Sequence, residues 1–201
     1  KFDPTNLKPE NIDQEITDIL GEVQSLQKEG KLRTLGLSNE SAWGTQKWVT
    51  IAEQQNLPRV VSIQNEYSLI CRIFDLDLAE TSIMEDVGLL AFSPLAAGPL
   101  SGKYLDGNVP ADSRRAQQDG LNGRYTPQSQ KAIGLYGDIA KKHGLNFAQM
   151  ALAFCLTRPF MASVIIGATS MEQLRINIAA KDLKLSLEVM EDIQMVQELN
   201  V

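Results

Sequence analysis

Residues 89–104 read LLAFSPLAAGPLSGKY. The short apolar run from Leu89 to Phe92 predicts a buried strand, which ends at Ser93-Pro94. Small residues and glycines follow, up to Lys103. A backbone with so few side-chain atoms lets a pyrophosphate approach closely, and a lysine beside it supplies a neutralising charge. The stretch therefore indicates a strand followed by a candidate phosphate loop, with a glycine-bearing turn and a solvated lysine as the alternative.

The segments around this stretch alternate between helix and strand. Apolar residues at helical spacing predict helices over residues 12–29, 43–55, 76–85, 171–180 and 187–199. Short apolar runs predict further strands at 32–37, 60–64 and 164–166. Continuously apolar strands that alternate with helices are typical of a parallel sheet covered by helices, so the sequence predicts an α/β fold.

Two insertions interrupt this alternation. Residues 96–125 are polar and rich in glycine, and the segment is too long for an ordinary connection, which is typical of a binding loop or lid. Residues 126–158 predict two additional helices, the second with small side chains on one face, including Ala148, Ala151 and Cys155. Because no linker divides the chain, we expect residues 1–201 to form a single domain.

Composition limits the classes of partner. The chain has 201 residues and a formal net charge of −6, with a pI near 4.9. A net negative charge argues against a surface that binds nucleic acid or an anionic membrane. Cys71 and Cys155 are predicted to be reduced thiols rather than a disulfide, and no apolar run has the ~20 residues of a membrane span. We therefore expect a cytoplasmic protein, although the chain begins at Lys1 rather than at a methionine.

Polar residues stand where each predicted strand ends. They are Ser38-Asn39, Gln64-Asn65-Glu66, Ser93-Pro94 and Gly167-Ala168-Thr169. In parallel α/β sheets the ligand site lies beyond the carboxyl ends of the strands, so these residues predict one shared rim. The alternative is that they only cap the helices that follow.

Known phosphate motifs do not account for the loop. A P-loop requires glycine at position 97 and a hydroxyl at position 104, where this chain has Ala97 and Tyr104. The Gly-x-Gly-x-x-Gly dinucleotide fingerprint is absent from the sequence as well.

Four motifs together resemble the aldo-keto reductase family, in the branch of the Tas-like members and potassium-channel beta subunits. They occur in the family's order: GLSN at 36–39, SIQNEYSL at 62–69, AFSPLAAGPLSGKY at 91–104 and VIIGATSMEQLRIN at 164–177. The resemblance implies a (β/α)8 TIM barrel that binds NADP(H) across its C-terminal rim. Only about the last four β/α units of such a barrel are recognisable here.

The resemblance also implies roles for individual residues. Ser38, Asn39 and Gln64 would hydrogen-bond the nicotinamide carboxamide, and Phe92 would stack on the nicotinamide ring. The pyrophosphate would be lined by Ser93, Pro94, Leu95, Ala97, Gly98, Lys103 and, from the long loop, Arg114. The adenosine and its 2′-phosphate would be held near Gly167 by Thr169, Gln173 and Asn177. Ile176 stands where relatives often have a glutamate, which leaves the preference for NADP over NAD open.

The family's proton-transfer residues belong to strands that are not recognisable in this chain. No catalytic residue is therefore assigned, and His143, in KKHGL, is interpreted as complementing a helix end. We expect a C-terminal fragment that is inactive alone and that pairs with its missing N-terminal half or self-associates through unpaired strand edges.

Two functions remain open at this stage. One is NADPH-dependent reduction of an aldehyde or ketone, and the other is a nucleotide-sensing or partner-binding module whose output is cofactor occupancy. The substrate is not identified by the sequence. Glu66 and Tyr67 are expected to reach a substrate pocket, and the alternative for Glu66 is a solvated loop carboxylate.

Overall fold

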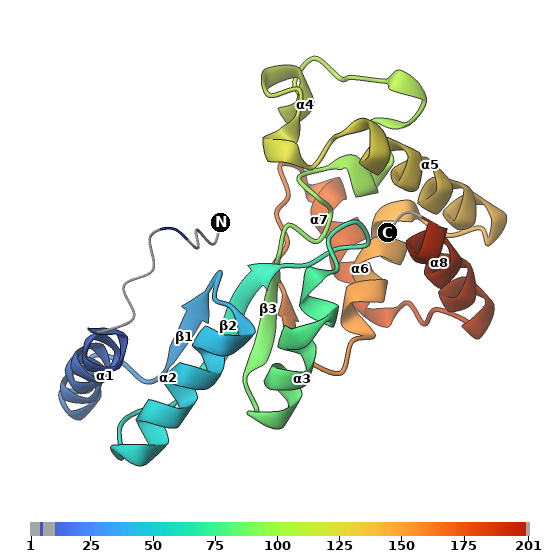
Figure 1. The fold of residues 1–201 in the computed structure, drawn as a ribbon. Helices are drawn as coiled ribbons and strands as arrows, with labels where there is room; N and C mark the ends of the chain where they lie inside the picture. The colour runs from blue at the N-terminus through green and yellow to red at the C-terminus, as the bar shows by residue number, and fades with distance from the viewer. Residues whose placement is uncertain (1–4, 6–10, 200–201) are drawn as a thin grey trace. The chain divides into compact units, whose positions relative to one another are not determined.

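The computed structural model describes residue 5 and residues 11–199 (Figure 1). Its strands form one four-stranded sheet in the order β1-β2-β3-β4, accompanied by helices, which confirms the α/β class. In chain order, with η for a 3-10 helix, the elements are α1 (Ile12–Lys28), β1 (Leu35–Ser38), α2 (Ala42–Gln54), β2 (Val60–Glu66), η3 (Ile73–Asp75), α3 (Asp77–Met84), β3 (Gly88–Phe92), η4 (Pro99–Ser101), η5 (Leu105–Gly107), α4 (Arg114–Gln117), η6 (Leu121–Gly123), α5 (Pro127–Lys142), α6 (Phe147–Leu156), β4 (Met161–Val164), α7 (Met171–Ala179), η7 (Ala180–Asp182) and α8 (Leu187–Leu199).

The sheet places two predicted site residues next to each other. Strands β1 and β2 pair in parallel, and Ser38 at the end of β1 lies opposite Gln64 in β2. The backbone amide of Asn39 continues the pairing by donating to the Gln64 carbonyl oxygen at 3.0 Å. The carboxyl ends of these two strands therefore lie side by side, as parallel strands require.

The predicted strands differ in their boundaries from the observed ones, most of all the first and the last. The first strand begins at Leu35 instead of residue 32, and the last spans Met161–Val164 instead of 164–166. Met161–Val164 has no continuous apolar run, so it carries no strand signal in its residues. The position of this strand is set by its pairing with β3 in the sheet. The pairing extends to the next residue, Ile165, whose amide donates to the Ala91 carbonyl oxygen at 2.8 Å.

The chain divides into two compact units by its internal contacts. The first unit comprises Lys1–Asn65 and Asp75–Leu89, and the second comprises Glu66–Phe74 and Leu90–Val201. In the first unit, α1 packs against α2 through a buried cluster of Ile16, Leu20, Ile51 and Ala52. Ile16 and Leu20 are one helical turn apart in α1, and Ile51 and Ala52 are adjacent in α2, so the facing sides of the two helices are withdrawn from water.

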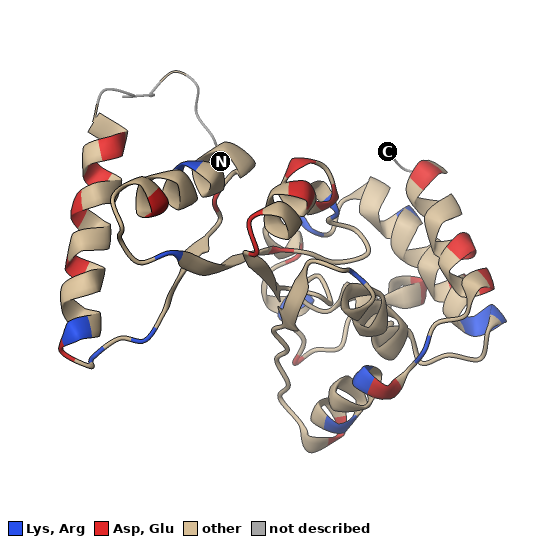
Figure 2. Cartoon of the chain, turned by 90° about the horizontal axis from the view of Figure 1, so that it is seen from below, with Lys and Arg blue, Asp and Glu red and all other residues tan. Residues whose placement is uncertain are grey.

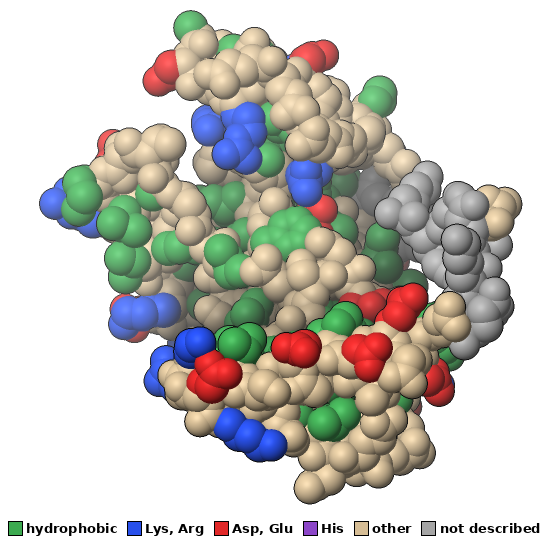
Figure 3. All heavy atoms as spheres, turned by 90° about the vertical axis from the view of Figure 1, so that its left-hand side faces the viewer, with side chains coloured by type: hydrophobic (Ala, Val, Ile, Leu, Met, Phe, Trp, Pro, Cys, Tyr) green, Lys and Arg blue, Asp and Glu red, His purple; other side chains and the backbone are tan. Residues whose placement is uncertain are grey.

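Helix α1 has an apolar inner face and an acidic outer face. Ile16, Leu20 and Val23 are buried, whereas its four carboxylates at positions 13, 15, 18 and 22 are exposed. Figure 2 shows acidic residues along this helix, and Figure 3 shows acidic side chains gathered in the lower part of the molecular surface. Asp13 and Glu15 in the first turn and Lys28 in the last turn complement the helix dipole.

The core of the second unit contains an aromatic cluster. Tyr67 packs on Phe154 and edge-on to Phe160, with ring centroids 6.3 and 5.6 Å apart, and Phe74 contacts Phe160 at 5.0 Å. Tyr67 is fully buried. The idea that Tyr67 reaches a substrate is therefore wrong, because its ring contributes to the core.

Helices α5 and α6 occupy most of residues 126–158. Thr126 begins α5 with a capping box, in which its hydroxyl accepts from the Ser129 amide and the Ser129 hydroxyl accepts from the Thr126 amide. The side chain of Asn146 caps α6 in a similar way. The α6 residues expected to pack inward are buried. Cys71 and Cys155 form no disulfide, as predicted.

Across the part of the chain that the structure describes, no helix combines the length and the apolar character that crossing a membrane requires.

Candidate functional site

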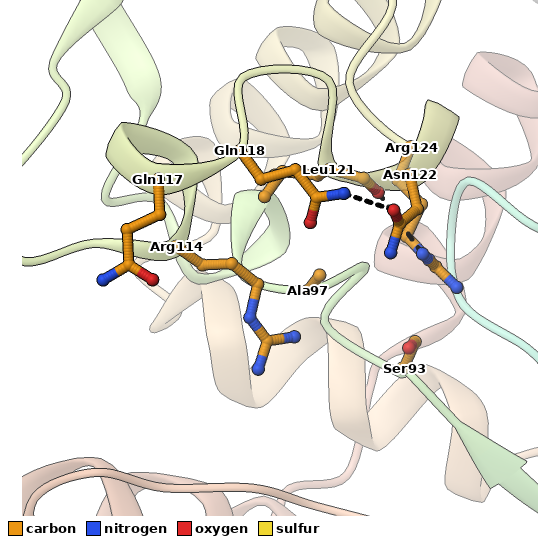
Figure 4. A pocket seen from close by; sticks show the side chains of 8 residues that line it. All are labelled: Ser93, Ala97, Arg114, Gln117, Gln118, Leu121, Asn122 and Arg124. Atoms are coloured by element: carbon orange, nitrogen blue, oxygen red, sulfur yellow. Dashed lines mark hydrogen bonds between the residues drawn. The ribbon is translucent and has the colours of Figure 1, made fainter.

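A pocket of about 400 Å3 lies in the second unit, beyond the end of β3 (Figure 4). It brings together three of the predicted site residues, namely Ser93, Ala97 and Arg114. Ser93 and Ala97 come from the stretch that follows β3, and the other six residues lie between positions 114 and 124. Those the sequence analysis did not identify are Gln117, Gln118, Leu121, Asn122 and Arg124.

The stretch after β3 has an unusual backbone. Ser93, Ala96, Ala97 and Gly98 all have positive φ, at 53°, 53°, 65° and 126°. Side-chain-bearing residues rarely adopt this conformation, and such positions concentrate at functional sites. The strand thus ends in a tightly curled chain whose small side chains leave its backbone open to a ligand.

Gly98 allows Lys103 to fold back against this curl. A Cβ atom at position 98 would lie 2.9 Å from Lys103 Cε and 3.3 Å from Lys103 Nζ. The Lys103 ammonium also lies 5.0 Å from the centroid of the Tyr104 ring. Gly98 and Lys103 are therefore brought together, although Lys103 does not line the pocket itself.

The hydroxyl of Tyr104 helps to hold the insertion in place. It accepts a hydrogen bond from the Arg115 backbone amide at 3.3 Å. Burial acts to raise the pKa of this hydroxyl, but hydrogen bonds with the Arg115 amide and the side chains of Ser113 and Lys103 outweigh burial and lower the pKa. Tyr104 thus connects the small-residue stretch to helix α4.

Helix α4 supplies the predicted Arg114 to the pocket. Its N-cap Ser113 is buried and accepts from the Ala116 amide, which fixes where the helix begins. In Figure 4, Arg114 points down from α4 toward Ala97, and Gln118 is hydrogen-bonded to Asn122. The pocket therefore has a roof of amide and guanidinium groups.

Arg124 is the functional candidate that the sequence analysis missed. Its guanidinium pairs with the Glu66 carboxylate, 58 residues away in the sequence. Glu66 is therefore not a solvated loop carboxylate, since only 24% of its side chain is exposed. The only sequence signal is a basic residue shortly before the N-cap of α5, which is too common to identify the pair.

Three further predicted residues, Phe92, Pro94 and Leu95, neighbour the pocket residue Ser93 in the chain. Phe92 is the last residue of β3 and is half-buried, while its carbonyl accepts from the Tyr67 amide at 3.3 Å. Pro94 is buried and Leu95 is partly buried.

The residues predicted to bind the nicotinamide carboxamide lie in the first unit, at the paired ends of β1 and β2. They are Ser38, Asn39 and Gln64.

A separate cluster gathers the four predicted residues around helix α7. The Gln173 side-chain oxygen accepts from the Thr169 amide at 2.9 Å and from its hydroxyl at 3.1 Å. The Asn177 side chain donates to the Gly167 carbonyl at 3.2 Å. These residues shape the start of α7 through bonds to one another, and Asn177 is buried in doing so.

His143 ends helix α5, as expected, and joins an ion-pair network with α8. Its Nε2 lies 2.7 Å from Asp192 Oδ2, and Lys142 Nζ lies 2.8 Å from the same oxygen and 3.3 Å from Glu188 Oε1. Among the described residues, His143, Glu188 and Asp192 form a group that has the ligand types of a metal site. Because the Lys142 ammonium already forms ion pairs with both carboxylates, we interpret the network as a clasp between helices.

This clasp predicts an acid-dependent contribution to stability. Hydrogen bonds with His143 and then with Lys142 hold the pKa of Asp192 below its ordinary value. A carboxylate with a lowered folded pKa stabilises the fold above its unfolded pKa of about 3.9, and that contribution is lost as pH falls through the folded pKa. In urea unfolding between about pH 5 and about pH 2, Asp192→Asn should therefore lose less stability than the wild type. Asp138→Asn, at an exposed site on α5, serves as the control, and equal losses in wild type and Asp192→Asn would refute the assignment.

Comparisons with known proteins agree with the four motifs. The model of the Aldo/keto reductase family matches residues 3–198. Protein tas of Escherichia coli is 45% identical over 188 residues, covering 92% of this chain and 53% of that protein. The L-glyceraldehyde 3-phosphate reductase of Escherichia coli is 36% identical, covering 75% of this chain and 45% of that protein. A probable voltage-gated potassium channel subunit beta of Oryza sativa is 33% identical, covering 77% of this chain and 51% of that protein. The chain thus spans about half the length of the curated relatives it matches.

Proposed function

Because the chain belongs to the aldo/keto reductase family, we propose that it holds the cofactor of an NADPH-dependent oxidoreductase that reduces aldehydes or ketones to alcohols. NADPH supplies the hydride in such a reaction, and the residues of this chain bind and orient the dinucleotide. The proposal places the fold within an α/β barrel, of which these four strands would be the last units.

The observation that carries this proposal is the combination of a bare, curled backbone with two cations. Lys103 folds against Gly98, and Arg114 lines the pocket beside Ala97. Both are positive charges in a chain whose formal net charge is −6. A pyrophosphate fits such a cradle, because its oxygens accept hydrogen bonds from the ammonium, the guanidinium and backbone amides.

The other proposed contacts follow from the chemistry of the dinucleotide. Ser38, Asn39 and Gln64 offer hydroxyl and amide groups to the nicotinamide carboxamide, which has one acceptor and two donors. Thr169 and Gln173 are exposed at the start of α7, where an adenosine 2′-phosphate would meet the positive end of the helix dipole. Ile176 provides no carboxylate toward the adenine. The preference for NADP over NAD is therefore proposed from the family resemblance and not from this position.

A second candidate function is nucleotide sensing, in which cofactor occupancy rather than turnover is the output. The same candidate includes a partner-binding module, and the similarity to a protein named as a probable potassium channel subunit supports that part of it. Both functions require dinucleotide binding, and they differ in whether a carbonyl compound is consumed. Absorbance loss from NADPH with a panel of reactive aldehydes, measured with the protein as its gene encodes it, separates them: turnover supports the reductase, and binding without turnover supports the sensor.

Phe92 gives a direct test of the binding proposal. Its position at the end of β3 predicts that its ring stacks on the nicotinamide, so Phe92→Ala should weaken NADPH binding by about 0.5–1.5 kcal/mol beyond the loss of buried area. The fluorescence of bound NADPH should change in the same variant, because its ring environment changes. Titration of NADPH against wild type, Phe92→Ala and the control Phe147→Leu provides the measurement. Identical affinity and emission in wild type and Phe92→Ala would exclude stacking at this residue.

A further inference from the structure

Asn65 is a partly buried polar residue near the end of β2, directly after Gln64. Its side-chain amide donates to the backbone carbonyl oxygen of Glu40 at 3.1 Å. Its side-chain oxygen Oδ1 is buried and has no hydrogen-bond partner among the described residues. A buried acceptor without a partner costs free energy, which an apolar residue of similar size would avoid. Stability alone therefore does not account for an asparagine at this position.

The side chain of Asn65 belongs to the packed face of the sheet. Ser38 lies opposite Gln64 across β1 and β2, and Leu37 lies opposite Ile63. Leu37 and Ile63 are buried, whereas Ser38 is exposed. Because side chains alternate between the two faces of a strand, Asn65 shares the face of Ile63 and not that of Gln64. It therefore approaches the turn after Ser38 from the face opposite to a ligand of Ser38 and Gln64.

The turn that follows β1 contains a residue with an uncommon backbone conformation. Asn39 has a φ of 54°, in the left-handed region that residues with a side chain rarely adopt. Asparagine tolerates this conformation better than most residues, yet it persists only where the surrounding structure fixes it. The Asn39 backbone amide donates to the Gln64 carbonyl oxygen at 3.0 Å, and its side-chain amide donates to the Ser38 hydroxyl at 3.3 Å. The position of the Ser38 hydroxyl therefore depends on this turn.

The next residue of the turn, Glu40, is held by local contacts and by Asn65. The Glu40 carboxylate accepts from the Ser41 backbone amide at 2.7 Å, and the Ser41 hydroxyl caps α2 by accepting from the Gly44 amide at 3.0 Å. A Cβ atom at position 44 would clash with the Glu40 side chain, so Gly44 leaves room for it over the first turn of the helix. The bond from Asn65 joins Glu40 to β2 across 25 residues of sequence.

We propose that Asn65 is a positioning residue that holds the Ser38–Asn39 turn in the geometry that binds the nicotinamide carboxamide. The proposal rests on the proposed function, since it takes NADPH as the ligand. Asn65 acts through the turn, from the packed face of the sheet, and touches no part of the dinucleotide. Its loss should therefore weaken binding at the nicotinamide end and leave binding at the adenosine end unchanged.

Two ligands separate the two ends of the dinucleotide in calorimetry on the protein as its gene encodes it. Asn65→Leu keeps the approximate size of the side chain and removes its donor, so NADPH should bind about fivefold more weakly, the effect of one lost hydrogen bond. Adenosine 2′,5′-bisphosphate has no nicotinamide and should bind Asn65→Leu and the wild type equally. The control Gln24→Met removes a side-chain bond to the Asn56 carbonyl in the same unit and should change neither affinity.

A readout without ligand follows the turn itself. In the free protein the Asn39 amide should exchange its hydrogen about fivefold faster in Asn65→Leu, because the turn opens more readily when one of its bonds is lost. Asn65→Asp has nearly the shape of the wild type but offers no amide donor to the Glu40 carbonyl. It should show at least the same change in exchange and in NADPH affinity, and it decides the matter when Asn65→Leu does not fold.

Combined variants locate the effect within the dinucleotide site. In a Ser38→Ala background, Asn65→Leu should weaken NADPH binding less than it does in the wild type, because its contribution passes through the Ser38 hydroxyl. In a Lys103→Met background the loss should equal that in the wild type, because Lys103 is assigned to the pyrophosphate. A general loss of folding would not distinguish the two backgrounds.

The outcomes that contradict the positioning role are separate from those that contradict the proposed function. Unchanged NADPH affinity, or an equal loss for NADPH and adenosine 2′,5′-bisphosphate, overturns the role of Asn65 and leaves the proposed function standing. Unchanged exchange of the Asn39 amide overturns the role of Asn65 without involving any ligand. Absence of NADPH binding by the wild type overturns the proposed function and the positioning role together.

Discussion

Replacing Gly98 with alanine is expected to lower the free energy of unfolding by about 3 kcal/mol. Gly98 has a φ of 126°, which residues with a side chain rarely adopt, and such strain costs about 1–3 kcal/mol. The new Cβ would also lie 2.9 Å from Lys103 Cε and 3.2 Å from the Tyr104 ring, so Lys103 must move. NADPH binding should weaken in the same variant, because the displaced ammonium no longer lies against the curl.

Thermal unfolding measures this effect, with a fall in Tm of about 6–12 °C expected for a chain of this size. Gly120→Ala is the matched control in the same insertion. Gly120 has a φ of −79°, and a Cβ atom added there would meet no atom within 4 Å beyond its chain neighbours. If Gly98→Ala and Gly120→Ala have the same Tm, the backbone curl does not require glycine.

Replacing Lys103 with methionine is expected to weaken NADPH binding by about 1.5–3 kcal/mol, the usual contribution of a hydrogen bond to a charged group. Methionine approximates the length of the side chain and removes the positive charge. The ammonium lies against Gly98, beside the pocket that holds Arg114, so its loss leaves part of the proposed pyrophosphate charge unneutralised.

Calorimetry with NADPH tests this prediction, and Lys131→Met, at an exposed position on α5, controls for the change in net charge. The Tm of Lys103→Met separates a binding effect from the lost contact with the Tyr104 ring at 5.0 Å. An unchanged affinity in Lys103→Met would falsify the assignment of Lys103 to the pyrophosphate.

Much of the local structure could be predicted from short sequence patterns. Ile16, Leu20 and Val23 indicated the buried face of α1, and the run Leu89 to Phe92 indicated β3. These signals involve residues within a few positions of one another, where helix period and strand length act directly. For the same reason the sequence identified the stretch from Ser93 to Lys103 as the centre of the candidate site.

Other features could not be predicted because they depend on distant parts of the chain. Met161–Val164 lacks an apolar run, and pairing within the sheet makes it a strand. Tyr67 followed a strand end, as a ligand-binding residue would, but packing against Phe154 and Phe160 buries it. The roof residues Gln117, Gln118 and Asn122 had no motif of their own.

The sequence by itself determined the alternation of strands and helices, the small-residue curl with its lysine, and the family, because each is encoded in contiguous or regularly spaced residues. The tertiary structure alone decided that Lys103 folds onto Gly98, that Arg114 roofs a pocket beside Ala97, and that Arg124 pairs with Glu66. The ion pair joins residues 58 positions apart. No local pattern specifies such a contact, since it forms only when packing brings Arg124 to the end of β2.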